Sequence, residues 1–193
     1  MANPGFRRVS EEELQRAWLF RVDRFHLVDP DGNPFDRFVI RHPGAVTVVP
    51  VHDNGTVTLV RQYRAAVDAM VLEIVAGTRD QEDESEEATA RRELAEEAGL
   101  AAAKLERLLG TWNTPGVSDQ HTTIFLATEL TDVESRPDGI EEGFMTVERI
   151  ALRELDSRKP DRTALAAMLS ELSRKLTSEA SAEAQGEEER STH

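Results

Sequence analysis

Large apolar and polar side chains alternate along residues 18–27, which is the period of a β-strand with one buried face. The following residues, 29–33, read Asp-Pro-Asp-Gly-Asn and have the composition of a tight turn. The segment Phe-Asp-Arg-Phe-Val-Ile-Arg-His at 35–42 comes soon after that turn. Together these segments predict an N-terminal β-hairpin.

Two further strands are predicted at residues 45–51 and 56–60, where β-branched residues dominate. The Asn54-Gly55 pair between them supplies the positive φ angles that tight hairpin turns require. We therefore expect a second hairpin here. Residues 70–77 form another short run rich in β-branched residues that ends at a glycine, and we expect one strand there.

The hydrophobic pattern changes its period after residue 85. Ala90, Leu94 and Ala98 recur at every fourth position, and Gly99 supplies a C-terminal stop. These features predict a helix that runs from Ser85 to Ala98.

Strands and a final helix are predicted for the rest of the chain. Strand-like runs occupy residues 105–112, 121–130 and 144–150, with polar loops between them. Apolar residues return at helical spacing over 162–176, which predicts a C-terminal helix. The last segment, 177–193, has almost no apolar content and is predicted to be a disordered acidic tail that the fold does not need.

Composition limits the classes of protein that fit this pattern. The 193 residues are 39% hydrophobic and 31% charged, with a mean hydropathy of -0.48, which is typical of a soluble globular domain. No apolar run approaches the roughly 18 residues that a membrane span needs, and the N-terminus lacks the apolar core of a signal peptide. We therefore expect a cytoplasmic protein with no membrane partner.

Cysteine content and charge narrow the chemistry further. The sequence contains no cysteine, which excludes disulfides, Cys-ligated zinc, iron–sulfur clusters and thiol nucleophiles. Any metal would be held by oxygen or by histidine, but the five histidines show no ligand spacing and suit isolated structural or surface positions. The formal net charge of -14 repels nucleic-acid backbones, so nucleic acid is not an expected partner.

Three glutamates gather on one face of the predicted helix. At about 100° per residue, Glu93, Glu96 and Glu97 share an arc of roughly 100°. Like charges crowded on one turn repel unless cations or ion pairs neutralise them, and Mg²⁺ prefers oxygen ligands together with substrate phosphates. The same charge pattern is also that of a solvated acidic face with ordinary ion pairs, such as Arg92 with Glu96.

The spacing around these glutamates resembles the Nudix box. That motif is a glycine, five residues, Glu, seven residues and then Arg-Glu-aliphatic-x-Glu-Glu-x-Gly-aliphatic. Residues 92–100 match every specified position of its second half, and seven residues separate Glu84 from Arg92. Gly77 lies one residue too far from Glu84, so the chain carries a one-residue insertion in this loop. The match makes the chain similar to Nudix hydrolases.

Further segments resemble the ADP-sugar branch of that family, to which ADP-ribose pyrophosphatases belong. The strand before the box reads Leu-Glu-Ile-Val-Ala-Gly, with Val75 where the branch usually has proline. Pro115 stands 15 residues after Leu100, at the marker position of the branch. Its loop reads Pro-Gly-Val-Ser-Asp-Gln, in which Gln120 replaces a glutamate. The resemblance covers roughly residues 18–155.

The resemblance implies a metal site and its ligands. Glu93 and Glu97 would be metal ligands, Glu96 would be a third, and the backbone carbonyl of Ala76 would complete a site for Mg²⁺, with Mn²⁺ as a substitute. Glu97 is expected at an exposed edge of the helix. Glu84 would either position metal-bound water or tie its loop to the arginine of the box.

The resemblance also implies residues that bind the substrate. Arg61 and Arg64 would pair with phosphate or stack on adenine, with ordinary surface arginines as the alternative. Glu73 resembles the position that hydrogen-bonds adenine or ribose. Trp18 and Phe20 are expected in the core or at an interface, with stacking against the base as the alternative.

A general base is expected outside the helix, because carboxylates bound to a metal lose their basicity. In the ADP-ribose branch, a glutamate on a mobile loop before the last strand has this task. The matching segment here is 137–143. Its candidates are Glu142, which is favoured because it lies nearer the following strand, and Glu141. An ordinary acidic loop is the alternative.

Together these features predict an α/β protein with the Nudix fold, an α/β/α sandwich around a mixed β-sheet with an N-terminal β-hairpin arm. Residues 1–44 are expected to form the arm and a homodimer interface, 45–176 the hydrolase domain and 177–193 the tail. The implied reaction is Mg²⁺-dependent hydrolysis of ADP-ribose to AMP and ribose 5-phosphate. The alternatives are hydrolysis of another nucleotide sugar or a dinucleotide, and a nucleotide sensor without activity.

Overall fold

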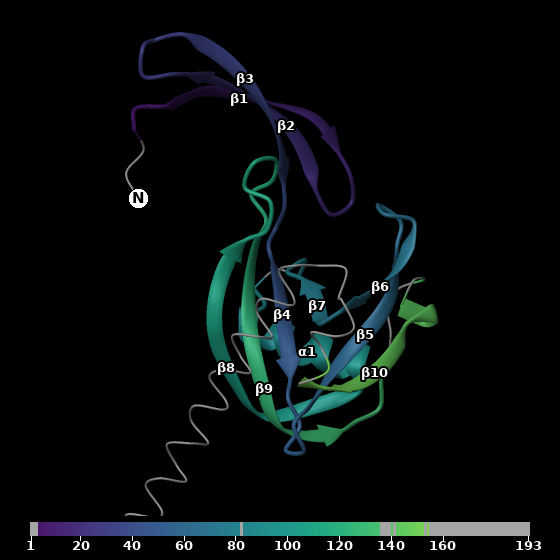
Figure 1. Ribbon diagram of the computed structural model, residues 1–193. Coiled ribbons are helices and arrows are strands. Elements are labelled where there is room, and N and C mark those ends of the chain that lie inside the picture. Colours follow the sequence, from purple (N-terminus) through teal and green to yellow (C-terminus); the bar gives the residue numbers. More distant parts are fainter. Residues whose placement is uncertain (1–3, 82, 136–139, 141, 153, 155–193) are drawn as a thin grey trace, which may run out of the picture. The chain divides into compact units, whose positions relative to one another are not determined.

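A computed structural model of the chain describes residues 4–81, 83–135, 140, 142–152 and 154 (Figure 1). In chain order its elements are β1 (Arg7–Arg16), β2 (Arg21–Val28), β3 (Pro34–Arg41), β4 (Ala45–Pro50), β5 (Thr56–Arg64), β6 (Ala69–Glu73), β7 (Val75–Thr78), α1 (Glu86–Ala98), β8 (Leu100–Trp112), β9 (His121–Asp132), the 3-10 helix η1 (Glu142–Phe144) and β10 (Thr146–Ala151). The helix predicted for 162–176 and the tail predicted for 177–193 lie outside the described residues. Within the described residues, α1 is the only α-helix of the predicted sandwich.

The described strands pair into three sheets, which together with α1 confirm the predicted α/β class. The sheet orders are β1-β2-β3, β10-β5-β6 and β7-β4-β9-β8. The chain divides into two compact units. The first consists of residues 1–47, 76–92 and 106–125, and the second of 48–75, 93–105 and 126–193.

The N-terminal sheet contains the predicted hairpin. β2 and β3 pair antiparallel along their whole length. Asp29 closes the turn between them, because its Oδ1 accepts hydrogen bonds from the backbone N–H groups of Asp31 and Asn33 at 3.0 and 2.8 Å. Residues 17–20 form a separate turn between β1 and β2, so β2 starts three residues later than predicted.

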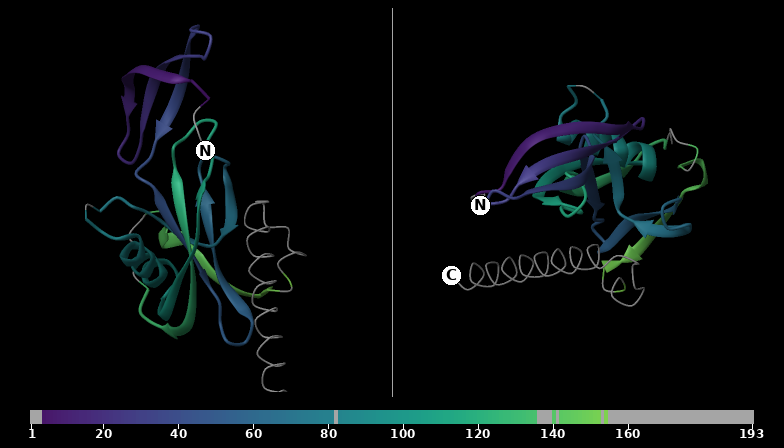
Figure 2. Two further views of the ribbon diagram at one scale, coloured as in Figure 1. Left: turned by 90° about the vertical axis from the view of Figure 1, so that its left-hand side faces the viewer. Right: turned by 90° about the horizontal axis from the view of Figure 1, so that it is seen from above.

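The first strand, β1, was not predicted, because all ten of its residues are exposed and no apolar alternation marks them. It lies beside β2 (Figure 2) and pairs with it antiparallel. The register shifts twice along this pair, between Arg8 and Ser10 and between Glu13 and Gln15. Ion pairs also join the two strands, from Arg24 to Glu12 at 3.2 Å and from Arg21 to Glu11 at 3.8 Å. Backbone pairing and opposite charges across the strands therefore stabilise β1 in place of burial.

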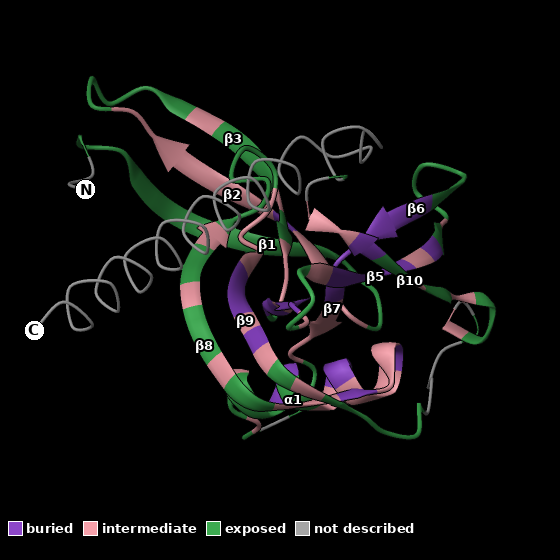
Figure 3. Ribbon diagram, turned by 60° about the horizontal axis from the view of Figure 1, so that its bottom comes forward, coloured by how far each residue is buried: buried purple, intermediate pink, exposed green. Residues whose placement is uncertain are grey.

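The second predicted hairpin keeps its turn but not its paired strands. Gly55 has a φ of +75°, and its N–H donates to the carbonyl of His52 at 2.9 Å. Beyond a bridge between Val51 and Val57, β4 and β5 join different sheets, so the expected hairpin is wrong in its pairing. Successive residues are buried in both strands, as Figure 3 shows for β5. Because such a strand is buried on both faces, its apolar pattern does not show which strand pairs with each of its edges.

The run at 70–77 was predicted as one strand and forms two. β6 ends at Glu73, β7 begins at Val75, and the two belong to different sheets. Residues 71–75 are all buried, so the apolar run looks the same whether the chain continues in one sheet or passes into another. The break at Ile74 therefore left no signal in the sequence.

The strands after the helix have shifted bounds. β8 starts at Leu100, five residues earlier than predicted, because the chain enters the sheet directly after the helix ends. β9 continues two residues further than predicted, to Asp132. Phe144, expected to open the last strand, instead ends η1, and β10 starts at Thr146.

The predicted helix is confirmed, and so is its C-terminal stop at Gly99. Ser85 caps α1, since its Oγ accepts a hydrogen bond from the N–H of Ala88 at 3.1 Å. Gly99 ends it with a φ of +63°, a conformation that side chains disfavour. Ala90 and Leu94 are fully buried, so the apolar face packs in the interior. No described helix is long and apolar enough to cross a membrane.

Candidate active site

The helix α1 carries the three glutamates of the box, and two of them are buried. Glu93 is 8% exposed and Glu97 is 4% exposed, whereas Glu96 is partly exposed. The expectation that Glu97 lies at an exposed helix edge is therefore wrong. Burial of a carboxylate costs free energy unless hydrogen bonds, ion pairs or cations compensate, and a divalent cation is a partner that two carboxylates one helical turn apart can share.

The donor chemistry of this helix suits Mg²⁺ or Mn²⁺. Within the part of the chain that the structure describes, no group of three or more His, Asp or Glu side chains already stands close enough to hold a metal ion. Mg²⁺ is usually bound by only one or two carboxylates, and substrate phosphates and water complete its shell. Glu93 and Glu97 fit that donor set. Glu96 on α1 and the carbonyl of Ala76 on β7 stay predicted as further ligands.

Glu84 is tied to the helix by Arg92. Nε and Nη2 of Arg92 donate to the two carboxylate oxygens of Glu84, both at 3.2 Å, and Thr89 Oγ1 donates to Glu84 Oε2 at 3.0 Å. These contacts hold the pKa of Glu84 below its usual value, and the hydrogen bonds from Arg92 are the largest cause. The tie to the arginine of the box, one of the two roles left open for Glu84, is therefore confirmed as a contact.

The one-residue insertion lies in the loop that leads to this ion pair. Asp83 has a φ of +65°, and the N–H of Glu84 donates to the carbonyl of Gln81 at 3.4 Å. Arg92 also lies 4.0 Å from Asp80. Despite the extra residue, Glu84 contacts Arg92 on α1.

We expect Glu84→Gln to lower the free energy of unfolding at pH 7 by about 1 kcal/mol, because it removes a partly buried ion pair with two charge-assisted hydrogen bonds. The folded-state pKa of Glu84 is depressed, so its contribution is complete above the ordinary value of 4.5 and is lost as the pH falls through the folded-state value. Calorimetry of the wild type and the variant should therefore show melting temperatures that differ at pH 7 and converge in acid.

The matched control is Glu87→Gln, which removes an exposed pair with Arg91 on the same helix. We expect this variant to change stability by less than about 0.5 kcal/mol. An equal loss in both variants, or a Glu84 effect that does not change with pH, would contradict the assignment of the pair as a stabilising tie.

Arg61 and Arg64 are both held in ion pairs with carboxylates of the sheet β10-β5-β6. Arg61 Nε donates to Glu148 Oε1 at 2.6 Å. Arg64 donates from Nε and Nη2 to Glu73 Oε2, at 3.0 and 2.5 Å, and Glu73 is buried. A phosphate would have to compete with these carboxylates for either guanidinium group. The roles of Arg61, Arg64 and Glu73 in substrate binding stay predictions.

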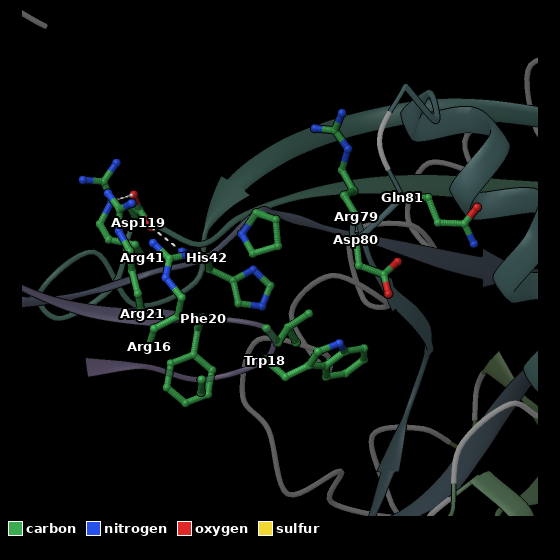
Figure 4. Close-up of a pocket in the computed structure, with 13 residues that line it drawn as sticks. Arg16, Trp18, Phe20, Arg21, Arg41, His42, Arg79, Asp80, Gln81 and Asp119 are labelled. Atoms are coloured by element: carbon green, nitrogen blue, oxygen red, sulfur yellow. Dashed lines mark hydrogen bonds and ion pairs between the residues drawn. The ribbon is translucent and has the colours of Figure 1, made fainter. Parts of the chain in front are cut away.

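Trp18 and Phe20 line an open hollow of about 700 Å³ in the first unit (Figure 4). Trp18 is 90% exposed and Phe20 43%, so the expected place in the core is wrong for both. The sequence misled because these aromatic residues fall in the turn between β1 and β2 rather than on a strand. Arg41 and His42 line the same hollow. Exposed aromatic faces beside cationic groups suit a ligand that is both aromatic and anionic.

Asp119 connects this hollow to the loop that carries Pro115. Asp119 Oδ2 accepts a hydrogen bond from Arg41 Nε at 2.5 Å, and Oδ1 accepts one from the backbone N–H of His42 at 2.9 Å, drawn as dashed lines in Figure 4. The grouping of Arg41, His42 and Asp119 was not predicted from the sequence. The aspartate within the Pro-Gly-Val-Ser-Asp-Gln loop was a signal, but nothing local showed that its partners lie 77 and 78 residues away.

Glu142, the favoured general base, opens η1 just before β10. Its side chain is partly exposed, and its carbonyl accepts a hydrogen bond from the N–H of Met145 at 3.0 Å. This backbone bond anchors Glu142 near the following strand, as the sequence argument required. Glu141 lies outside the described residues. The choice of Glu142 as base stays a prediction.

Comparison with known sequences gives a family. A sequence model described as the NUDIX domain matches residues 41–172. An ADP-ribose pyrophosphatase of Bacillus subtilis (strain 168) is 34% identical over 151 residues, which cover 76% of this chain and 81% of that protein. An ADP-ribose pyrophosphatase of Mycobacterium tuberculosis is 37% identical over 148 residues, which cover 76% of this chain and 71% of that protein.

Comparison with solved structures supports the same fold. The crystal structure of an ADP compounds hydrolase aligns with a TM-score of 0.78 and 22% sequence identity. The alignment covers 93% of this chain and 98% of that chain. The predicted fold is thereby confirmed.

Proposed function

The chain belongs to the NUDIX family, and on that basis we propose that it hydrolyses the diphosphate of ADP-ribose to AMP and ribose 5-phosphate with Mg²⁺. The observation that carries the proposal is the complete set of box glutamates on α1, two of them buried. Enzymes of this family generally use a divalent metal. The two relatives named as ADP-ribose pyrophosphatases support the choice of substrate.

The proposed reaction joins the oxygen of a water molecule to one phosphorus of the diphosphate, while the bond from that phosphorus to the bridging oxygen breaks. Glu93 and Glu97 would hold a divalent cation, with Glu96 as a further ligand. The cation, when bound, supplies charge stabilisation at the phosphoryl oxygens and lowers the pKa of water. The carboxylate of Glu142 would take the proton of the attacking water, and the bridging oxygen leaves on the other phosphate product.

The hollow lined by Trp18 and Phe20 supports a nucleotide as the ligand. Its aromatic faces suit stacking against a base, and its arginines suit a negatively charged group. Arg61 and Arg64 would stabilise the diphosphate by exchanging their carboxylate partners for phosphate oxygens. The resemblance implied these roles in substrate binding, and we propose them for this chain.

We also propose a homodimer formed through the N-terminal arm, residues 1–44. The arm exposes several large apolar side chains, including Val9, Phe38 and Ile40, and such a concentration on one small sheet is typical of a surface that another chain covers. Light scattering of the full chain should give about twice the monomer mass of 21.5 kDa. A monomer mass at micromolar concentration would contradict it.

A direct test incubates the purified chain with ADP-ribose, a GDP-sugar and a dinucleotide, each with Mg²⁺ or Mn²⁺. Chromatography of one part of each reaction identifies the products. Alkaline phosphatase added to the other part releases phosphate from the monophosphate products, which measures the rate. We expect AMP and ribose 5-phosphate from ADP-ribose as the fastest reaction. A faster reaction with the GDP-sugar would make another nucleotide sugar the substrate, and binding of ADP-ribose without turnover of any compound would make the chain a sensor.

A further inference from the structure

The geometry points to His42 as a base-binding residue that donates a hydrogen bond from its Nε2–H to the edge of a nucleobase held in the hollow of Trp18 and Phe20. The inference rests on the proposed function only for the identity of the nucleotide. The sequence pattern did not indicate a binding role for His42. The contacts of its ring, the anchoring of its backbone and the character of its neighbours carry the inference.

The hydrogen bond to Nδ1 determines which ring nitrogen of His42 carries the proton. The N–H of Gly44 donates to Nδ1 of His42 at 3.1 Å. A neutral imidazole has one acceptor and one donor nitrogen, so an accepting Nδ1 places the proton on Nε2. Desolvation by burial lowers the pKa of His42, and the charge of Asp119 opposes this only in part, so the ring is neutral at pH 7.

The Nε2 atom of His42 is available to a ligand. His42 lines the hollow, and no residue in the described parts of the chain makes a hydrogen bond with its Nε2. The ring therefore presents a single N–H donor of defined tautomer in a wall that also contains two exposed aromatic side chains (Figure 4).

The backbone on both sides of His42 is anchored, which fixes the direction of the ring. The N–H of His42 donates to Asp119 Oδ1 at 2.9 Å, while Asp119 Oδ2 is held by Arg41 at 2.5 Å. Gly44 has a φ of +104°, a conformation that lets its N–H turn back to the ring two residues earlier. A donor held in this way loses little conformational entropy when a ligand binds.

The character of the neighbours favours a base rather than a phosphate as the acceptor. A neutral N–H is a weak partner for an anion, and Trp18 and Phe20 offer flat apolar faces that stack on an aromatic ring. The nearby guanidinium groups are the stronger phosphate donors, although Arg16, Arg21 and Arg41 already pair with carboxylates. A ring nitrogen or carbonyl oxygen at the edge of a base is thus the acceptor that fits.

Two substitutions separate the two nitrogens of His42. His42→Asn keeps an acceptor oxygen near the position of Nδ1, where the N–H of Gly44 can still bind, but has no donor at the position of Nε2. His42→Gln has an amide N–H near the position of Nε2 but no acceptor for Gly44. The Asn variant should therefore keep the melting temperature and lose ligand affinity, whereas the Gln variant should do the opposite.

The experiment measures binding of AMP, GMP and ribose 5-phosphate to the full chain by isothermal titration calorimetry, without divalent metal. We expect His42→Asn to weaken AMP binding about 5- to 10-fold and His42→Gln less than about 3-fold, with ribose 5-phosphate unchanged in both. Equal weakening of AMP and ribose 5-phosphate would place the hydrogen bond on ribose or phosphate and overturn the inference. Unchanged AMP affinity in the Asn variant would also overturn it.

The wild type separates this inference from the proposed function. If it binds GMP in preference to AMP, the proposed substrate is wrong, and the same comparison of variants with GMP still decides the role of His42. If it binds neither nucleotide but hydrolyses ADP-ribose, the hollow is not the base site and the inference falls while the function stands. As a second readout, the fluorescence of Trp18 in a Trp112→Phe background should change on addition of AMP.

Discussion

Glu97→Gln is expected to lower kcat by about 10²- to 10⁴-fold while the protein stays folded. The substitution removes one charge from the carboxylates that would hold the metal. A metal at a phosphoryl group stabilises the transition state by several kcal/mol. Each loss of about 1.4 kcal/mol lowers the rate tenfold. Glu97 is buried, and glutamine is nearly isosteric, so loss of a buried charge should not unfold the helix. Steady-state kinetics with ADP-ribose over a series of Mg²⁺ concentrations measures the effect.

The control for Glu97 lies on the same helix. Glu87→Gln changes an exposed glutamate that pairs with Arg91, and its kcat should stay within about twofold of the wild type. The Glu97 variant should also need more Mg²⁺ for half-maximal rate, which a general loss of stability would not produce. Comparable kcat for wild type and Glu97→Gln at saturating Mg²⁺ would refute the assignment of Glu97 as a metal ligand.

Glu142→Gln is expected to lower kcat by about 10²- to 10⁴-fold with little change in KM. If the carboxylates of α1 are occupied by metal, the proton of the attacking water must go to a group elsewhere, and Glu142 is anchored by η1 directly before β10. Glutamine keeps the size of the side chain but cannot take a proton. The measurement is kcat and KM of the wild type and the variant with ADP-ribose at saturating Mg²⁺.

Glu141→Gln is the matched comparison for Glu142. It removes a neighbouring charge from the same segment, and if Glu142 is the base its kcat should fall by less than about tenfold. A large loss in the Glu141 variant together with near-normal turnover of Glu142→Gln would assign the base to Glu141. Near-normal turnover in both variants would mean that this segment is an ordinary acidic loop.

Local features of the fold could be predicted because nearby residues determine them. Ser85 and Gly99 mark the two ends of α1 by hydrogen bonding and by a positive φ, both of which act within one helical turn. The turn closed by Asp29 and the turn at Gly55 have the same origin. The register of the box on the helix was therefore predictable, and so was the ion pair of Glu84 with the box arginine as one of two options.

Sheet membership could not be predicted, because it depends on which strand edges are available in the folded chain. β4 and β5 share a turn but join different sheets, and β6 and β7 share an apolar run but do the same. The alternation of apolar and polar residues shows which face of a strand is buried, but it does not show which strand pairs with it. The fully exposed strand β1 lacks even that signal, since pairing and cross-strand charges define it.

The sequence by itself determined the helix, the tight turns and the register of the box residues on the helix, because each depends on hydrogen bonds and dihedral angles within a few residues. Only the tertiary structure decided that Glu97 is buried, that Trp18 is exposed and that Arg64 is paired with Glu73. It also decided that Asp119 anchors His42, a contact across 77 residues of sequence. Burial and long-range pairing arise from the packing of segments distant in the chain, and no local pattern of residues encodes which of them meet.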